Sequence, residues 1–452
     1  MTTEKKIHLL CPEYVPLENK GEEAIIRGVV DVLNLEAGCV YHIVDNNSKK
    51  YYFKNGIHVH PGALFFSDWR SREFGLGMSI HQLYSSACAI LRHLLNIIYP
   101  RWISRPHKEA RNLGLLLRNV KLAPKRFEKS IDLLKNVDYI IAGHNGGLDE
   151  YVCHILREFH TIGIPYGIYG SSMKPNVTNK AIIEVFRKAL SGANFVITRN
   201  PIGHQWALKH FQDINIEISP DPAFGMNATN NSDTNALISD LGLVNFFSKK
   251  VIMFTTAEPA PIIRHAFNQF SSSAKKIEAH REYFAKVVNH IHKKYDVNLL
   301  FLPHTIGPSA GMDVREISKD IINRAGLEKD DRVFCLESDL SAMELKGIIN
   351  LAEMLVAERV HSVIGAIGVC TPFLLLSSKA DTRGLGIIDR QMGLGKYIKY
   401  LNEPSLVEVT TAIDEIILER QIVQNELETV NITIREELDK VANQIRQKIT
   451  SS

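Results

Sequence analysis

Residues 352–368 read AEMLVAERVHSVIGAIG, and this stretch decides the fold class. It begins with a short apolar run, continues through three ionisable residues (Glu358, Arg359 and His361) and ends in small apolar residues. We interpret it as a buried strand, a charged turn at the carboxyl end of that strand, and the start of a helix. A strand that leads directly into a helix is the repeating unit of α/β proteins with parallel strands.

The same alternation of strands and helices continues on both sides of this stretch. A polar segment at 226–236 (MNATNNSDTNA) reads as a linker between two such series. We therefore predict two Rossmann-like α/β domains, at 1–230 and 231–405, facing a cleft, because ligands of open α/β sheets bind beyond the carboxyl ends of the strands. The predicted strands lie at 6–10, 40–44, 138–143, 165–170, 194–199, 216–223, 249–257, 297–304 and 372–377, and the predicted helices include 21–38, 178–192 and 281–295.

Two segments depart from the alternation. Residues 66–127 are basic and helix-prone, and we interpret them as a helical insertion near the cleft or at an oligomer contact, with a peripheral membrane contact as the alternative. Residues 406–452 are predicted to be helices that pack back on the body, with a short coiled-coil contact as the alternative. The apolar residues of the long last helix fall three and four apart: Leu427, Val430, Ile434, Leu438, Val441 and Ile445.

Composition excludes several classes of protein. Hydrophobic residues make up 45% of the 452 residues, enough for large cores, and a net charge of +3 gives no sign of nucleic-acid binding. The six cysteines are scattered without metal-binding spacing, which favours reduced thiols and a cytoplasmic protein. The N-terminus has too short an apolar run for a signal peptide or membrane anchor. No residue cluster predicts a metal site.

The first turn after the first strand holds Asn19, Gly21 and Glu22, just before a predicted helix. Backbone N–H groups at a helix N-terminus can bind an anion or a sugar hydroxyl. A helix cap with acidic residues in the first turn explains the same residues equally well.

Other strand ends of the first half carry small or polar residues. Asn145, Gly146 and Gly147 would allow close approach of a ligand to the backbone, or form a tight turn. Ser171 belongs to a small polar shelf. Arg199 could bind phosphate or carboxylate through its forked guanidinium, or form a structural ion pair.

The second half offers three further candidates besides a prolyl turn at Asp221, which we interpret as structural. His304 ends an apolar strand and could donate or accept a proton, or be a core histidine. Arg359 and His361 stand at the start of a helix, an arrangement that suits a phosphorylated and carboxylated small molecule. The alternative is a Glu358–Arg359 ion pair with His361 as a cap.

These pieces occur in a familiar order, which resembles the polysaccharide pyruvyltransferase family, including its colanic acid branch. The resemblance covers about residues 7–400, and its most specific motif, Arg-Leu-His in the family, corresponds to Arg359, Val360 and His361. The motifs that carry it are NKGEEAI, AGHNGG, GIYGSSMKP, ITRN, SPDPAF, FLPH and ERVHSVIGAIGVCTPFLLL.

The resemblance implies a GT-B-like fold and the transfer of pyruvate from phosphoenolpyruvate to a sugar hydroxyl pair of a cell-surface polysaccharide or its precursor, forming a ketal. It makes Arg359 an anion ligand and His361 the general acid, with phosphoenolpyruvate as donor substrate and no cofactor or metal. Arg199, His304 and Ser362 would also bind the donor. Residues of the N-terminal domain would bind the glycan acceptor: Asn19, Gly21, Glu22, Asn145, Gly146, Gly147 and Ser171.

Several positions depart from the family pattern. Valine replaces leucine at Val360, and Glu22 stands where an aspartate is usual. Two other functions therefore stay open: a GT-B glycosyltransferase that uses a nucleotide sugar, and a non-catalytic glycan-binding relative. The expected partners are the small-molecule donor and a glycan, without nucleic acid, in the cytoplasm or at the inner face of the membrane. A homo-oligomer is left open.

Overall fold

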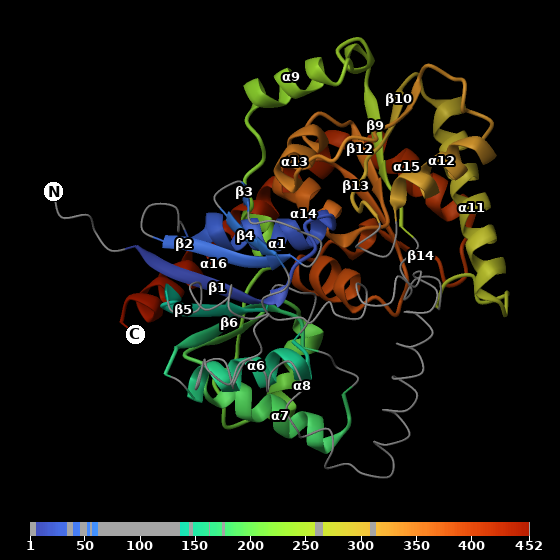
Figure 1. Ribbon diagram of the computed structural model, residues 1–452. Coiled ribbons are helices and arrows are strands. Elements are labelled where there is room, and N and C mark those ends of the chain that lie inside the picture. Colours follow the sequence, from blue (N-terminus) through green and yellow to red (C-terminus); the bar gives the residue numbers. More distant parts are fainter. Residues whose placement is uncertain are drawn as a thin grey trace, which may run out of the picture. The chain divides into compact units, whose positions relative to one another are not determined.

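Parallel strands alternate with helices in the computed structural model, as the sequence predicts (Figure 1). The structure describes residues 6–33, 39–45, 52–54, 57–61, 136–143, 148–161, 163–173, 177–257, 265–307 and 313–451. The chain divides into two units. The first comprises Met1–Val15, Asn34–Ser219 and Asn443–Ser452, and the second comprises Pro16–Leu33 and Pro220–Ala442.

The first unit contains an eight-stranded sheet in the order β3-β4-β2-β1-β5-β6-β7-β8. Every pair of neighbours is parallel except β3 and β4. The six residues of β6 are all buried, as expected for a central parallel strand. The strands are β1 (Ile7–Tyr14), β2 (Cys39–Asp45), β3 (Tyr52–Lys54), β4 (Ile57–Pro61), β5 (Tyr139–Ala142), β6 (Tyr166–Ser171), β7 (Val196–Thr198) and β8 (Glu217–Ile218).

Three helices of the first unit follow these strands: α6 (Glu150–Thr161), α7 (Lys180–Ser191) and α8 (Pro201–His210). The sequence sets their starts. Asn179 and Asn200 cap α7 and α8 by accepting backbone N–H groups, and a proline begins α8.

The second unit contains a six-stranded, wholly parallel sheet in the order β11-β10-β9-β12-β13-β14. This is the 3-2-1-4-5-6 order of a doubly wound sheet, in which the order reverses between β9 and β12. Ligands bind beyond the strand ends at that reversal. The strands are β9 (Val251–Thr255), β10 (Asn298–Phe301), β11 (Val333–Cys335), β12 (Met354–Ala357), β13 (Phe373–Ser377) and β14 (Ile398–Tyr400).

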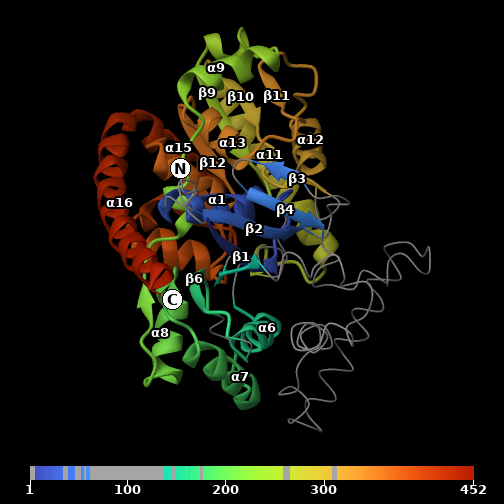
Figure 2. The ribbon, with the colours of Figure 1, turned by 60° about the vertical axis from the view of Figure 1, so that its left-hand side comes forward.

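Helices of the second unit connect these strands. They include α13, which begins with a capping box made by Ser341 and Glu344. The last helix, α16, is continuous (Figure 2), and its residues from Asn443 onward are grouped with the first unit. The helices are α1 (Lys20–Leu33), α9 (Asn231–Asp240), α11 (Ser273–Lys294), α12 (Val314–Arg324), α13 (Ala342–Ile349), α14 (Val360–Gly368), α15 (Leu406–Leu418), α16 (Arg420–Thr450), the π-helix η8 (Gly384–Gln391) and the 3-10 helices η6 (Pro222–Gly225), η7 (Phe246–Ser248) and η9 (Gly395–Tyr397).

The predicted strands and the long C-terminal helix are confirmed. All six residues of the predicted apolar stripe are buried or partly buried in α16. The short strands β3, β4, β11 and β14 were not predicted from the sequence. The predicted insertion at 66–127 lies outside the described residues. No helix in the described part of the chain is long and apolar enough to cross a bilayer.

The division between the units differs from the predicted boundary near residue 230. It falls between Ser219 and Pro220, and Pro16–Leu33 belongs to the second unit. The reason is packing: α1 lies against η6, with Gly28 so close to the Pro222 carbonyl that no side chain would fit.

The prediction of a linker at 226–236 is wrong in its second half, where α9 begins at Asn231. The polar residues that suggested a linker make a helix start instead. The side chain of Asn230 caps α9 by accepting the N–H of Asp233. Thr234 and Ile238, four residues apart, are the buried residues of this helix.

Four histidines lie on one face of the first unit's sheet: His8, His42, His58 and His60. A ring nitrogen of His42 lies 3.0 Å from one of His8, and its other nitrogen lies 3.0 Å from one of His60. Burial, followed by the charges of the neighbouring histidines, lowers the pKa of His42 to about 3. Burial likewise lowers the pKa of His60 to about 4.

This cluster predicts a loss of stability in acid. His42 stays neutral in the folded chain, whereas an unfolded histidine takes up a proton near pH 6.5, so stability falls as the pH drops below that value. Between pH 7 and pH 5, the free energy of unfolding of His42→Gln should fall by roughly 1–2 kcal/mol less than that of wild type. Urea unfolding at both pH values measures this. His160→Gln, at an exposed histidine of α6, is the control. An equal loss in wild type and H42Q would contradict the prediction.

Candidate functional site

The turn between β12 and α14 stands beside the reversal of strand order in the second unit. Its three ionisable residues, Glu358, Arg359 and His361, line a pocket, together with residues from the start of α1, the end of β10 and the segment after β13. All of them belong to the second unit. The pocket residues are Asn19, Glu22, His304, Glu358, Arg359, Val360, His361, Asp381 and Arg383.

Glu358 fixes this turn. Its N–H donates to the Thr255 carbonyl at 2.9 Å, and its carboxylate accepts the Ala257 N–H at 2.7 Å. The other carboxylate oxygen pairs with Nε2 of His280, and neither side chain is exposed. The carboxylate of Glu358 therefore bonds to Ala257 and His280. It does not form the Glu358–Arg359 ion pair that was the structural alternative in the sequence analysis.

Arg359 is the N-cap residue of α14, and its carbonyl accepts the hydroxyl of Ser362 at 2.7 Å. Its Nε atom is buried and has no hydrogen-bond partner among the described residues. Burial, and then the nearby charge of Arg383, lowers the pKa of Arg359 to about 10. A guanidinium in this position is well suited to receive an anion.

His361 lies in the first turn of α14, and its side chain is only 9% exposed. Its Nε2 atom lies 3.8 Å from a carboxylate oxygen of Asp221, which is completely buried. The ring packs on Gly21, where an added Cβ would lie 2.6 Å from Nδ1. Asp221 also caps η6, so one turn both starts a helix and places a carboxylate beside the imidazole.

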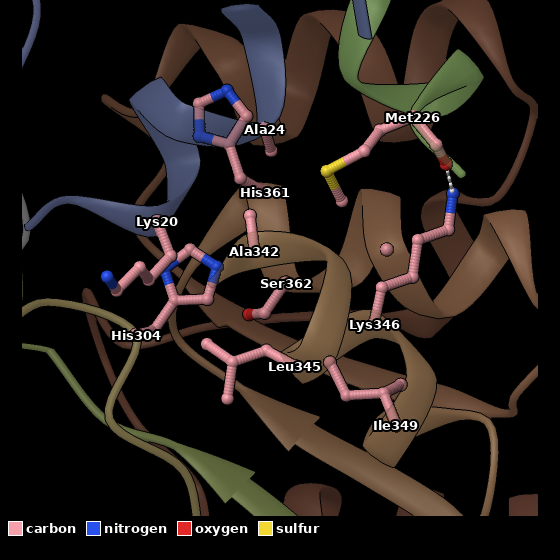
Figure 3. A pocket seen from close by; sticks show the side chains of 11 residues that line it. Lys20, Ala24, Met226, His304, Ala342, Leu345, Lys346, Ile349, His361 and Ser362 are labelled. Carbon is pink, nitrogen blue, oxygen red and sulfur yellow. Dashed lines mark hydrogen bonds between the residues drawn. The ribbon is translucent and has the colours of Figure 1, made fainter. Parts of the chain in front are cut away.

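His304 follows β10 and lines this pocket, and with His361 it also lines a second pocket, which Figure 3 shows. It is 5% exposed, and its buried Nδ1 atom has no hydrogen-bond partner in the described part of the chain. Burial, and then the charges of Arg359, His361 and Lys20, lowers its pKa well below the usual value. His304 is therefore a neutral imidazole near pH 7, able to make hydrogen bonds but unsuited to carry a proton.

The N-terminus of α1 supplies Asn19, Lys20 and Glu22. Asn19 accepts the Gly21 N–H through its side chain, as the helix-cap alternative predicted, and also lines the pocket. Lys20 is buried, and its ammonium contacts Asp339 at 2.6 Å. The Lys20 N–H donates to the His304 carbonyl, which ties α1 to the end of β10.

Sequence reasoning missed Asp381 and Arg383, which follow β13. The Arg383 N–H and Nε both donate to Asp381, at 3.0 and 3.3 Å. Asp381 mainly, with Glu22 and Asp221, raises the pKa of Arg383 above its usual value. The signal was available, because polar residues after a buried parallel strand are candidates by the same rule that selected Arg359.

The structure also limits two predicted donor ligands. The hydroxyl of Ser362 is engaged by Thr255 at 2.7 Å and by the Arg359 carbonyl, so its role in donor binding stays a prediction. Arg199 lies in the first unit, completely buried, with Nε donating to Ser172 at 3.2 Å.

The predicted acceptor residues separate into two groups. Asn19, Gly21 and Glu22 lie in the second unit with Arg359 and His361, because α1 packs there. Ser171 lies in the first unit beside Arg199, with its hydroxyl accepting the Leu148 N–H. Asn145, Gly146 and Gly147 lie outside the described residues.

The pocket therefore combines two arginines, a histidine with a carboxylate neighbour and a neutral histidine. Guanidinium groups stabilise phosphate or carboxylate, and an imidazole can transfer a proton near neutral pH. Within the described ranges, no group of three or more His, Cys, Asp or Glu side chains could hold a metal ion.

Comparison with known protein families gives a match over most of the chain. The sequence profile of the family described as polysaccharide pyruvyl transferase matches residues 19–379. A search of curated protein sequences gives no match.

Solved structures give the fold. The chain is similar to a UDP-forming α,α-trehalose-phosphate synthase from Burkholderia xenovorans (10% identity, TM-score 0.55, 99% of each chain covered). It is also similar to a UDP-GlcNAc 2-epimerase from Neisseria meningitidis bound to UDP-GlcNAc (9% identity, TM-score 0.53, covering 99% of this chain and 100% of that one). At these identities the likeness concerns the fold alone, and it confirms the predicted GT-B-like class.

Replacement of Gly21 tests the packing of His361. Gly21→Ala places a methyl group against the imidazole, so we expect about 1–3 kcal/mol of destabilisation and shifted His361 ring signals. Urea unfolding and NMR of the imidazoles measure these effects. The control is Gly365→Ala in α14, in the lining of the second pocket, where the new methyl would meet only Lys346 Cγ at 3.9 Å. Unchanged His361 signals in G21A would show that the ring does not pack there.

Removal of Glu358 tests its structural role. Glu358→Ala leaves His280 and the Ala257 N–H without a buried partner, so we expect a loss of about 2–5 kcal/mol in the free energy of unfolding. Glu353→Ala is the control, because its partly exposed pair with Arg420 should be worth less than about 1 kcal/mol. A near-wild-type stability of E358A would contradict the structural assignment.

Proposed function

Because the chain belongs to the polysaccharide pyruvyl transferase family, we propose that it transfers a pyruvyl group from phosphoenolpyruvate to a pair of sugar hydroxyls, forming a ketal. The acceptor is a cell-surface polysaccharide or its precursor, and the reaction takes place in the cytoplasm or at the inner face of the membrane. One observation carries the choice of donor: the buried, unpartnered Nε of Arg359 stands beside His361 at the start of α14.

The charges of the pocket support an anionic donor. Arg359 remains a cation at neutral pH even with its pKa near 10, and Arg383 shares the pocket with it. A guanidinium can form two parallel hydrogen bonds to a phosphate or carboxylate. The N-terminus of α14 adds its own preference for negative charge.

His361 is the proton donor in this proposal. Its proton goes to the methylene carbon of phosphoenolpyruvate, which becomes the methyl group and leaves a cationic centre at the adjoining carbon. One sugar hydroxyl attacks that carbon, phosphate leaves, and the second hydroxyl closes the ketal. Of the two hydroxyl protons, one restores His361 and the other leaves with phosphate.

The neighbours of His361 suit this task. Asp221 lies 3.8 Å from Nε2 of His361, so a carboxylate stands beside the imidazole that transfers the proton. Arg359 offsets the charge that develops on the departing phosphate. The neutral His304 can hydrogen-bond the ligand without competing for the transferred proton.

Two substitutions separate binding from proton transfer. We expect His361→Asn to lower acceptor-dependent phosphate release roughly 100-fold or more, with phosphoenolpyruvate affinity changed only a few-fold. Arg359→Gln should weaken phosphoenolpyruvate binding roughly 10- to 100-fold, because a charge-assisted contact is lost. Calorimetry and a phosphate-release assay on a glycan panel measure these quantities.

Arg281→Gln is the control, since Arg281 pairs with Asp320 on the surface of the same unit. Wild-type protein that binds UDP-sugars but not phosphoenolpyruvate would favour a nucleotide-sugar glycosyltransferase instead. Binding of a glycan without turnover of any donor would favour a non-catalytic relative.

A further inference from the structure

We propose that Arg383 is a second anion ligand of this pocket and that it binds the carboxylate of the donor, while Arg359 and the start of α14 bind the phosphate. The inference rests on the proposed function for its choice of these two anionic groups. It adds a binding residue outside the Arg-x-His motif, from the segment that follows β13.

The position of Arg383 is the first argument. It lines the same pocket as Arg359, His304 and His361, although it comes from a different strand end. Its charge is close enough to lower the pKa of Arg359, second only to burial in that effect. Two guanidinium groups that repel each other across one pocket are stabilised together when an anionic ligand lies between them.

The contacts of Arg383 with Asp381 are the second argument. The chain contains a similar pair in Asp313 and Arg315, which also stand two residues apart and share the same bond from the arginine N–H. In that pair the carboxylate takes both Nε and Nη2 of the guanidinium, at 2.9 and 2.6 Å. In Arg383 the bond to Asp381 engages Nε alone, at 3.3 Å. Asp381 therefore positions the guanidinium and leaves its two terminal nitrogens for a ligand.

The division between phosphate and carboxylate follows from the surroundings of each arginine. Arg359 is the N-cap residue of α14, where the N–H groups of the first turn favour the group with the larger negative charge. The side chain of Arg383 is about one-third exposed and has Glu22 and Asp221 nearby, which suits the singly charged carboxylate better.

The test uses ligands that carry one or both anionic groups. Calorimetry with the full chain, at fixed ionic strength, compares inorganic phosphate, 2-phosphoglycolate and phosphoenolpyruvate. We expect wild type to bind the two carboxylated ligands more tightly than phosphate. Arg383→Gln should weaken both of them roughly 10- to 100-fold, toward the affinity for phosphate, while phosphate binding changes less than about 3-fold.

Further variants separate this role from a structural one. Arg383→Lys keeps the charge but loses the fork, so its affinity should be intermediate. Arg315→Gln, in the matched pair that lies outside the pocket lining, should bind all three ligands as wild type does. Thermal unfolding of each variant confirms that it is folded.

Three results would overturn the inference: equal affinity of wild type for phosphate and 2-phosphoglycolate, unchanged binding in R383Q, or an equal loss for all three ligands. The last result would mean that Arg383 acts only through its general charge. Tight, Arg383-dependent binding of 2-phosphoglycolate without turnover of phosphoenolpyruvate would instead refute the proposed function and leave this inference standing.

Discussion

The buried carboxylate of Glu358 is the interaction on which the arrangement of the pocket depends. It joins the ends of β9 and β12 through the Ala257 N–H and anchors α11 through His280. Both strands lie at the reversal of strand order, so the next two ionisable side chains of the pocket, Arg359 and His361, start from a fixed backbone. Such a pair contributes little net stability relative to two apolar side chains, because both groups lose their hydration, although removal of one partner leaves the other buried and unpaired. Its value lies in holding one geometry for the residues that follow.

The second constraint is the position of α1. Gly28 lets this helix approach the Pro222 carbonyl, and Gly21 lets it approach the His361 ring. The helix therefore forms part of the unit that contains Arg359, although the strand before it belongs to the other unit. Each glycine acts by its lack of a side chain rather than by an unusual backbone conformation. Substitutions at these two positions would change the pocket without replacing any ionisable residue.

Much of the fold could be predicted from sequence, because buried parallel strands appear as short apolar runs between amphipathic helices. The pattern at 352–368 gave a strand, a charged turn and a helix in the places where the structure has them. Short edge strands such as β11 and β14 lack a long apolar run and were missed. The position of α1 could not be predicted either, because strand–helix order does not say which sheet a helix packs on. For the same reason Asn19 and Glu22 were predicted to belong to the N-terminal domain, and Arg383 was not predicted because the sequence does not show that β13 pairs with β12.

The pocket contains a buried cation, Arg359, in surroundings that do not favour positive charge. Burial lowers the pKa of Arg359 and that of His304, which means that the surrounding chain destabilises positive charge there. The carboxylate of Glu358 bonds to His280, so it acts on Arg359 only through its charge and not through a hydrogen bond. Asp381 holds Arg383 by one nitrogen, and Asp221 stands 3.8 Å from His361. Arg359 thus keeps a buried Nε atom without a hydrogen-bond partner among the described residues, and an anionic ligand would supply negative charge there. The free energy of folding maintains this buried charge, and binding of an anionic ligand would make it more favourable.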